Sequence, residues 1–333
     1  VLPVTKGAAP NPESYLDRKL PISTDAYPNW PATPARSEEL LLNRTYQIES
    51  KREAGAGTTG AKMLVLKFPQ DNISLNVKWK EMKRGWNPLW GHLDGVNNSP
   101  RKEIAAWKIQ ELLFDTEDFV VPLSLAECLP VEKYFDSSIR PTQDGSNCVL
   151  GVYSIWLDNL KVRKPLIEND RFNSDYVYAY YLSNLNLFTY LVKHHDGREG
   201  NFLVSKEEQR PQVFSIDTGV AFGQGFNGLF YNWFVPNWNS MRVPALQQES
   251  IARLENLTIN DLVEKLGVVA ELELGADGIY RNVPLGKNID QDKGVRITGN
   301  TIQLGLTHDE IVDIWNRIAA LTEDVAKGKI AVF

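Results

Sequence analysis

The feature that most constrains this chain is a polar segment followed by two short apolar segments and an aspartate. Residues 194–201 read H-H-D-G-R-E-G-N, so that Asn201 follows Asp196 by 201 − 196 = 5 positions. A short apolar run comes next, then a polar turn, and then a second apolar run that leads to Asp217. Short apolar runs joined by a turn predict two β-strands. Any fold of this chain has to accommodate that order of polar residues and strands.

Phosphoryl transfer is the chemistry that requires these residue types in this order. A kinase places one Asp beside the hydroxyl to be phosphorylated, and an Asn and a second Asp hold a metal ion against the ATP phosphates. Asp196 would therefore orient the acceptor hydroxyl and take its proton. Asn201 and Asp217 would supply the hard oxygen ligands that suit Mg²⁺ or Mn²⁺. The alternative is a surface turn at Asp196 and Gly197 with Asp217 capping a loop, which accounts for the glycine but not for the whole order.

A kinase also needs a lysine on a strand and, further along, a glutamate on a helix that orients the lysine. Residues 73–82 alternate as a strand does, with apolar side chains on one face and Lys78 and Lys80 on the other. Residues 102–114 carry apolar side chains at helical spacing, and Glu103 lies in the first turn, which favours a carboxylate. The bland alternative is two solvated strand lysines and an ordinary acid at a helix start. Their order along the chain favours the kinase interpretation.

A glycine-rich segment precedes these elements, with Gly55, Gly57 and Gly60 in the pattern G-x-G-x-x-G. A dinucleotide-binding fold would need a buried strand before this pattern and a helix after it, and the sequence has neither. Two interpretations stay open: a hairpin whose backbone amides cover phosphates, and a flexible turn. Further on, an apolar run ending at Trp156 and Leu157 predicts a strand entering the connection between two lobes. Backbone groups there would meet adenine; a plain core strand is the alternative.

Several short motifs also occur, in the same order, in a known family. They are K-E-M-K at 80–83, E-I-A-A-W at 103–107, V-V-P at 120–122, G-S-N-C-V-L-G at 145–151, I-D-T-G-V-A-F-G at 216–223 and P-A-L-Q-Q at 244–248. In these motifs the chain resembles the Golgi casein-kinase family, the secretory-pathway kinases grouped as "family with sequence similarity twenty". The resemblance implies a kinase-like fold with ATP and metal chemistry, and it favours Lys80 over Lys78 as the lysine that grips the phosphates.

The chain departs from that family in two respects. Its segment 194–201 is more similar to the catalytic loops of aminoglycoside phosphotransferases and phosphoinositide kinases, and it lacks the family's many cysteines. The kinase-like fold and the nucleotide chemistry are therefore what the resemblance implies. Phosphorylation of protein serines does not follow from it with the same weight.

The expected fold class is α+β: a two-lobed, protein-kinase-like fold with a β-rich N-lobe and a mainly helical C-lobe. We expect an N-terminal extension over residues 1–45, the N-lobe over 46–160 and the C-lobe over 161–333, with a β insertion near 268–304. A chain of 333 residues of which 43 % are hydrophobic can bury a core in two lobes. The proline-rich residues 1–40 predict an extended arm over the domain or a disordered leader.

Two helices and one loop are expected in the C-lobe. Residues 175–193 predict a helix that leads into the catalytic loop. Thr307 and Glu310 form a capping box at the start of a terminal helix. The buried side of that helix should carry Ile311, Ile314, Ile318 and Leu321. The aromatic-rich segment 222–240 occupies the place of an activation or substrate loop, with most of its aromatics packed as core.

Charge and cysteine content add few restrictions. The net charge is 36 − 42 = −6 without a long charged run, so no nucleic-acid partner is implied, and no apolar stretch approaches transmembrane length. Cys128 and Cys148 flank a turn-rich segment between two expected strands; a disulfide across a hairpin and two separate buried thiols both stay open. The chain begins at Val1 without a signal peptide, so either an export signal was removed or the chain was trimmed. A secreted or extracytoplasmic location is slightly favoured over a cytoplasmic one.

Three functional hypotheses follow. The favoured one is an ATP- and divalent-metal-dependent kinase with Asp196, Lys80 and Glu103 as catalytic residues. The second is a pseudokinase or nucleotide-binding regulator without catalysis, which the complete set of motifs disfavours. The third is a metal-dependent hydrolase built on His194, His195, Asp196 and Asp217, which leaves Lys80 and Glu103 without a role. The acceptor is open among a protein side chain, a sugar, a lipid headgroup and a small metabolite, because loops rather than motifs determine specificity.

Overall fold

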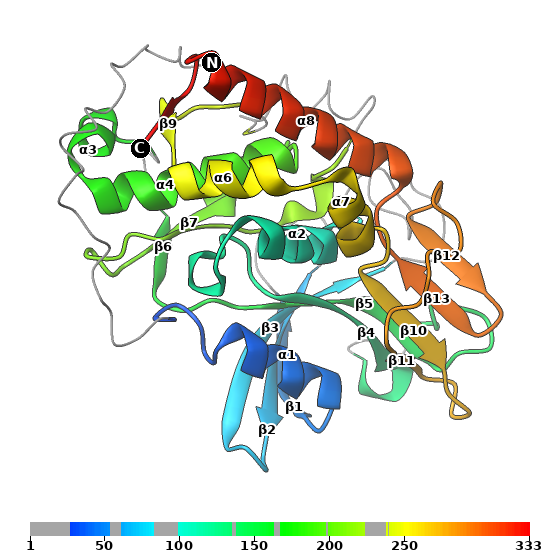
Figure 1. Cartoon of the computed structure of the whole chain (residues 1–333). Helices are drawn as coiled ribbons and strands as arrows, with labels where there is room; N and C mark the ends of the chain where they lie inside the picture. Colours follow the sequence, from blue (N-terminus) through cyan, green and yellow to red (C-terminus); the bar gives the residue numbers. More distant parts are fainter. Residues whose placement is uncertain are drawn as a thin grey trace.

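The first lobe of the molecule is built on a five-stranded antiparallel sheet. The structure, a computed structural model, describes residues 27–53, 61–82, 99–134, 138–162, 167–197, 199–223, 238 and 240–333. The strands pair in the order β1-β2-β3-β5-β4. Their bounds are β1 Gln47–Glu53, β2 Lys62–Phe68, β3 Ile73–Glu81, β4 Ser124–Pro130 and β5 Cys148–Ile155. In Figure 1 this sheet forms the lower part of the molecule, and most of the helices lie above it.

Strand β3 gives the sheet one apolar and one charged face. Successive side chains of a strand point to opposite sides. Leu75, Val77 and Trp79 are buried in the core, and Lys78 and Lys80 project from the other side, as the alternation in the sequence predicts. Both lysines reach Glu103 in helix α2, so this helix covers the charged face of the strand.

Helix α2 (Pro100–Leu113) is an interior helix between the two lobes. It begins at Pro100, whose fixed φ and missing N–H suit the first helical position. Most of its residues are buried, because it packs on β4 and β5 on one side and on helices α6 and α7 on the other. Figure 1 shows it in the middle of the molecule. The helix predicted over residues 102–114 is thus confirmed, and it occupies the junction of the lobes.

Helix α1 (Pro34–Asn43) corrects the expectation of an extended or disordered arm for residues 34–40. The Thr33 hydroxyl accepts a hydrogen bond from the Arg36 N–H, and a proline occupies the first turn. Leu40 and Leu41 are buried in the core. Proline content predicted the arm, but a proline just after an N-cap starts a helix instead of preventing one. Residues 1–26 lie outside the described part of the chain.

The second lobe surrounds helix α4 (Tyr176–Leu191), which is buried along most of its length. Its N-cap is Asp175, whose carboxylate accepts the Tyr178 N–H, and it confirms the helix predicted over 175–193. A three-stranded antiparallel sheet of β6, β7 and β8 lies nearby. The bounds of its strands and of the neighbouring elements are β6 Leu160–Val162, β7 Phe202–Ser205, β8 Val213–Ser215, α3 Asn169–Ser174, β9 Ala245–Leu246, α6 Gln248–Asn256, α7 Ile259–Leu266 and β14 Ala331–Val332.

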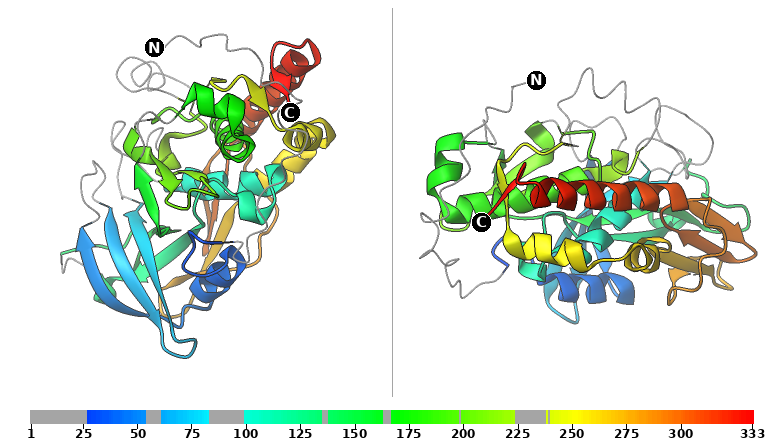
Figure 2. Two further views of the ribbon diagram at one scale, coloured as in Figure 1. Left: turned by 90° about the vertical axis from the view of Figure 1, so that its left-hand side faces the viewer. Right: turned by 45° about the horizontal axis from the view of Figure 1, so that its top comes forward.

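The terminal helix α8 (His308–Ala326) begins at the predicted capping box. The Thr307 hydroxyl accepts the Glu310 N–H, and the Glu310 carboxylate accepts the Thr307 N–H. The predicted apolar side chains are its buried ones: Ile311, Ile314, Ile318 and Leu321. In Figure 2 the helix runs across the outer side of the second lobe. The molecule is therefore an α+β protein with a sheet-rich lobe and a mainly helical lobe.

A second sheet, formed within residues 270–304, joins the lobes at one side of the molecule. It has the strand order β11-β10-β13-β12. Its strands are β10 Ala270–Leu274, β11 Tyr280–Asn282, β12 Val295–Thr298 and β13 Thr301–Leu304. The Asn147 N–H donates to the Gly278 carbonyl over 2.6 Å, and the Asn282 side chain donates to the Ala126 carbonyl over 2.9 Å. The β10–β13 sheet is thus hydrogen-bonded to the five-stranded sheet at its β4 edge and next to the start of β5.

Cys128 and Cys148 form a disulfide, which settles the alternative left open by the sequence. Their Cα atoms lie 5.3 Å apart on the paired strands β4 and β5. The bond therefore closes the turn-rich segment between these strands. Within the described ranges, the molecule has no helix with the length and apolar character needed to cross a membrane.

Candidate active site

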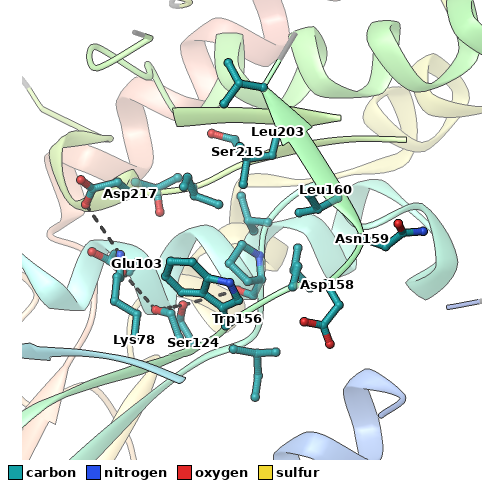
Figure 3. Close-up of a pocket in the computed structure, with 18 of the residues that line it drawn as sticks. Lys78, Glu103, Ser124, Trp156, Asp158, Asn159, Leu160, Leu203, Ser215 and Asp217 are labelled. Carbon is teal, nitrogen blue, oxygen red and sulfur yellow. Dashed lines mark hydrogen bonds and ion pairs between the residues drawn. The ribbon is translucent and has the colours of Figure 1, made fainter. Parts of the chain in front are cut away.

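A cavity of about 380 Å³ lies between the five-stranded sheet and the β6–β8 sheet. Its wall comes from strands of both lobes and from the segment that connects them (Figure 3). The lining includes Lys78, Glu103, Ser124, Ser154, Trp156, Leu157, Asp158, Asn159, Leu160, Leu203, Ser215 and Asp217. A volume of a few hundred Å³ is usual for small-molecule sites. Lys78, Glu103 and Asp217 gather at one end, the charged end, and the remaining lining mixes apolar side chains with Asp158, Lys161 and Lys206, so the cavity suits a ligand with an apolar part and an anionic part.

Two lysines and two carboxylates meet at the charged end. Lys80 Nζ lies 2.6 Å from Glu103 Oε1 and 2.7 Å from Asp217 Oδ1. Lys78 Nζ lies 3.1 Å from Glu103 Oε2 and 3.8 Å from Asp217 Oδ1. The side chains of Lys80 and Glu103 are each 3 % exposed, and those of Lys78 and Asp217 are 18 % and 28 % exposed. Lys80 therefore lies behind the cavity wall, while Lys78 and Asp217 face the cavity.

The local structure explains why these four groups meet. Positions 78 and 80 are two apart on β3, so both side chains leave the same face of the strand. Glu103 projects from the first turn of α2, which packs against that face. Asp217 follows β8 with φ +60°, in the left-handed region, which Asp tolerates better than most residues. Three segments far apart in the sequence thus converge on one point.

The electrostatics keep this cluster charged despite its burial. Burial alone would raise the pKa of Glu103, but the charges of Lys78 and Lys80 outweigh it and lower that pKa. Burial alone would lower the pKa of Lys80, but Asp217 and Glu103 outweigh it and raise that pKa. The buried Glu103 is therefore ionised and the buried Lys80 protonated at neutral pH.

The connection between the lobes presents one backbone donor to the other end of the cavity. The Trp156 N–H donates to the Asn76 carbonyl over 2.8 Å, and the Asp158 N–H donates to the Asn29 carbonyl over 2.9 Å. Between them, the Leu157 N–H has no acceptor among the described residues. An acceptor atom of a planar base could take that bond, with the half-exposed Trp156 beside it.

Asn29 and two serines shape this site without having been predicted from the sequence. The buried Asn29 side chain donates to the carbonyls of Asp158 and Asn159 and so fixes the connection between the lobes. Ser124 and Ser154 form the back wall, with their hydroxyls 2.8 Å apart, and Ser154 donates to Glu103 Oε2 over 3.1 Å. Ser154 interrupts an otherwise apolar strand, and that was the one sign of its role in the sequence.

Asp196 and Asn201 lie beside the cavity but are not part of its lining. The Asn201 side-chain amide donates to the Asp196 carbonyl over 2.9 Å, and the Ile216 N–H donates to the Asn201 carbonyl over 2.9 Å. Asn201 directly precedes β7 and Asp217 closely follows β8, which pairs antiparallel with β7. The β7–β8 hairpin thus brings Asn201 and Asp217 to the same end, with Asp196 bonded to Asn201.

His194 supports the loop through its backbone. Its N–H donates to the Thr189 carbonyl, and its carbonyl accepts the Trp238 N–H. The ring is fully buried against the edge of Phe202, and neither ring nitrogen has a hydrogen-bond partner among the described residues. Burial lowers the pKa of His194 to about 4, so the ring is neutral at pH 7. His195 lies with Nε2 3.4 Å from the Gly223 carbonyl.

Some predicted residues lie outside the described part of the chain. They are Gly55, Gly57 and Gly60 of the glycine-rich segment and nearly all of the aromatic segment 222–240. Strands β1 and β2, which flank the glycine-rich segment, pair antiparallel as a hairpin does. The interpretation of those glycines as phosphate-covering stays a prediction.

Comparisons with known proteins gave structural likenesses only. No protein-family model matches the chain. No curated protein sequence matches it either. Among solved structures, it is similar to "crystal structure of the Golgi casein kinase with Mn/ADP bound", with 13 % identity, a TM-score of 0.47 and coverage of 87 % of this chain and 76 % of that one. It is also similar to "Crystal structure of the golgi casein kinase", with 13 % identity, a TM-score of 0.49 and coverage of 95 % and 82 %. The chain is thus distantly similar to these kinase structures.

Proposed function

We propose that this protein is an ATP- and divalent-metal-dependent kinase that transfers the γ-phosphoryl group to a hydroxyl. The observation that carries the proposal is the buried Lys80, held between Glu103 and Asp217 at the charged end of the cavity. Protein kinases need a strand lysine paired with a helix glutamate, and an aspartate that holds the metal, in place at the same time. Here Lys80, Glu103 and Asp217 meet in this way. Leu157, whose N–H would bind the base, lines the cavity away from these three residues.

The lysines would neutralise the phosphates. Lys78 faces the cavity and Lys80 is oriented by two carboxylates, so the pair presents positive charge without a large reorganisation. The resemblance in sequence favours Lys80 as the principal contact, and the exposure of Lys78 adds this residue as a second contact. The backbone N–H of Leu157 and the ring of Trp156 would hold the base.

Asn201 and Asp217 would hold the metal ion. The Asn201 side-chain nitrogen is used by the Asp196 carbonyl, which leaves its Oδ1 without a donor among the described residues. Asp217 contributes a carboxylate from the same end of the β7–β8 hairpin, and two hard oxygen ligands suit Mg²⁺ or Mn²⁺. The described residues form no group of three or more His, Cys, Asp or Glu side chains placed for a metal. That fits a site in which substrate phosphates complete the coordination. A bound ion would neutralise phosphate charge during transfer.

Asp196 would orient the acceptor hydroxyl and take its proton. Its position is fixed by the hydrogen bond from Asn201 to its carbonyl and by the backbone bonds of the neighbouring His194. The acceptor hydroxyl would belong to a protein side chain, a sugar, a lipid headgroup or a small metabolite. The Cys128–Cys148 disulfide supports an oxidising, extracytoplasmic compartment, because such bonds are rare in the cytosol.

The hydrolase hypothesis has little support from this geometry. The ring of His194 is buried against Phe202, and Asp217 is engaged by two lysines. A nucleotide-binding regulator without catalysis would use the same cavity, and only a transfer assay separates it from a kinase.

The test is a thermal-shift titration with ATP, with and without Mg²⁺ or Mn²⁺, followed by mass spectrometry for phosphate on the chain itself and on acceptor mixtures. Ligand at about 100 times its Kd stabilises a protein by about 2.7 kcal/mol. We expect metal-dependent stabilisation that disappears in Asp217→Ala and persists in Asp115→Ala, an aspartate paired with Arg253 outside the cavity. Asp196→Ala should keep the nucleotide shift and lose transfer. Absence of a shift with every nucleotide and metal would refute the proposal.

A further inference from the structure

The start of α2 contacts both lobes. The Ser99 N–H, directly before the helix, donates to the Gly219 carbonyl over 3.0 Å, two residues after Asp217. Arg101 binds Glu310 at the start of α8. Glu103, two positions on, binds Lys80 of the first lobe. The start of α2 is thus held from both lobes at once.

Arg101 is the strongest of these attachments. Its Nη1 lies 2.8 Å from Glu310 Oε2 and its Nη2 lies 3.0 Å from Glu310 Oε1, which is the paired geometry that makes Arg–carboxylate contacts strong and directional. Nη1 also donates to the Gly305 carbonyl over 2.9 Å. The guanidinium fits so closely against Gly294 that a Cβ at that position would collide with it. Arg101 is therefore enclosed by α8 and the β10–β13 sheet.

Glu310 is itself fixed. Its carboxylate accepts the Thr307 N–H over 2.9 Å as part of the capping box of α8. Burial alone would raise the pKa of Glu310, but the charges of Arg101 and Lys102 outweigh it and lower that pKa. The buried Lys102 Nζ adds a second positive group 3.7 Å from Glu310 Oε1. An ionised carboxylate at the rigid start of a long helix thus holds the first turn of α2.

We infer that Arg101 is a positioning residue, which keeps Glu103 oriented toward Lys80 by fastening α2 to α8 and to the β10–β13 sheet. The inference rests on the proposed kinase function, in which transfer requires that the lysine–glutamate pair be in place. It also gives the β10–β13 sheet a role: this sheet is hydrogen-bonded to the first lobe at β4 and next to β5, and the residues at the ends of its strands enclose Arg101. The orientation of Glu103 is then built into the fold and does not wait for nucleotide.

A matched pair of conservative variants tests this. Arg101→Lys keeps the positive charge but loses the paired bonds to Glu310 and the bond to the Gly305 carbonyl. Arg296→Lys is the control: Arg296 is equally buried, belongs to the same sheet region, and donates to the carbonyls of Gly267 and Leu306 in place of a carboxylate. Both variants lose a guanidinium of the same kind, but only Arg101 belongs to α2. Glu310→Gln is a second variant on the partner side, because Gln retains the capping bond to Thr307.

The first readout is hydrogen exchange of the backbone amides of residues 99–113 without nucleotide. We expect slow exchange in the parent chain, faster exchange in Arg101→Lys and Glu310→Gln, and no change there in Arg296→Lys. The second readout is the turnover rate. Misplacement of a catalytic group by about 1 Å can lower the rate on the order of 10²-fold. We therefore expect at least a tenfold lower kcat in Arg101→Lys and Glu310→Gln, and no such loss in Arg296→Lys. Nucleotide KM should change less than kcat, because neither Arg101→Lys nor Glu310→Gln alters the connection between the lobes, whose Trp156 and Leu157 would hold the base.

Unchanged exchange in Arg101→Lys overturns the inference. Equal effects of Arg101→Lys and Arg296→Lys on exchange and kcat also overturn it, because the role would then be general stability. If the parent chain transfers no phosphate, the proposed function fails, while the exchange measurement still decides whether Arg101 fastens α2.

Discussion

Replacing Glu103 with Gln perturbs the site at its most buried point. The substitution keeps the shape of the side chain and an acceptor for the Ser154 hydroxyl, but it removes the negative charge that faces Lys80 at 2.6 Å and Lys78 at 3.1 Å. Lys80 then loses one of its two carboxylate partners, but Asp217 Oδ1 remains 2.7 Å from its Nζ, so the loss is partly compensated.

The remaining contact with Asp217 determines how much unfolding free energy the Glu103→Gln variant loses. Removing one partner of a buried ion pair costs about 3–5 kcal/mol when the other charge is left alone. Because Asp217 and Ser154 still contact the cluster, we expect the lower end, about 3 kcal/mol. An unfolding entropy of about 2.1 cal/mol/K per residue amounts to about 0.7 kcal/mol/K for a chain of 333 residues, so this loss of free energy lowers Tm by about 4 °C. The pKa of Glu103 is lowered in the folded state, so its stabilising effect is complete above about pH 4.5 and fades as the pH falls below that value. The difference in unfolding free energy between the parent chain and Glu103→Gln should therefore become smaller below about pH 4.5.

The assay is thermal and urea unfolding at several pH values, together with ATP titration and a transfer assay. Glu111→Gln is the matched control, because Glu111 lies on the same helix and pairs with Lys108 and Lys265 in a more exposed position. Each such pair contributes at most about 1 kcal/mol. A Tm loss in Glu103→Gln no larger than that of Glu111→Gln would refute the buried charge cluster. Undiminished transfer in Glu103→Gln would remove Glu103 from the catalytic set.

Two further predictions concern stability. The pKa of His194 is about 4 in the folded chain against 6.5 for the free side chain, so the unfolded state takes up the proton first as the pH falls. Relative to His194→Phe, the parent chain should lose about 3 kcal/mol of unfolding free energy between pH 6.5 and 4, and parallel stability profiles of the two would contradict this. The Cys128–Cys148 disulfide closes a loop with a sequence separation of 20, so the double Ser variant should lose about 3 kcal/mol in urea unfolding, and equal midpoints would show that the bond contributes nothing.

The parts of the fold that the sequence predicted are those that local periodicity determines. The alternation in β3 placed Lys78 and Lys80 on one face, and the capping box placed the start of α8. The order of these motifs then predicted that Lys80, Glu103 and Asp217 meet. Helix α1 was not predicted, because the high proline content of this segment suggests an extended chain. The position of Pro34 in the first turn nevertheless favours the start of a helix.

The contacts that hold the site in place were not predictable, because they join residues far apart in the sequence without a local pattern. Asn29 binds carbonyls at positions 158 and 159, and Arg101 binds a carboxylate at position 310. An asparagine in an irregular segment and an arginine in a helix are common on protein surfaces, so neither indicates burial. Only the folded chain shows that each is enclosed and what it holds.

The proposed activity depends on regions outside the cavity as well as on the residues of the sequence motifs. The chemistry falls to a few side chains with readable motifs, but phosphoryl transfer is mostly positioning. In this molecule the positioning is supplied by the segment around Asn29, which fixes the connection between the lobes, and by the β10–β13 sheet with α8, which encloses Arg101. The sheet within residues 270–304, for which the sequence suggested no role, therefore helps to enclose Arg101, which itself joins the terminal helix to the helix that carries Glu103.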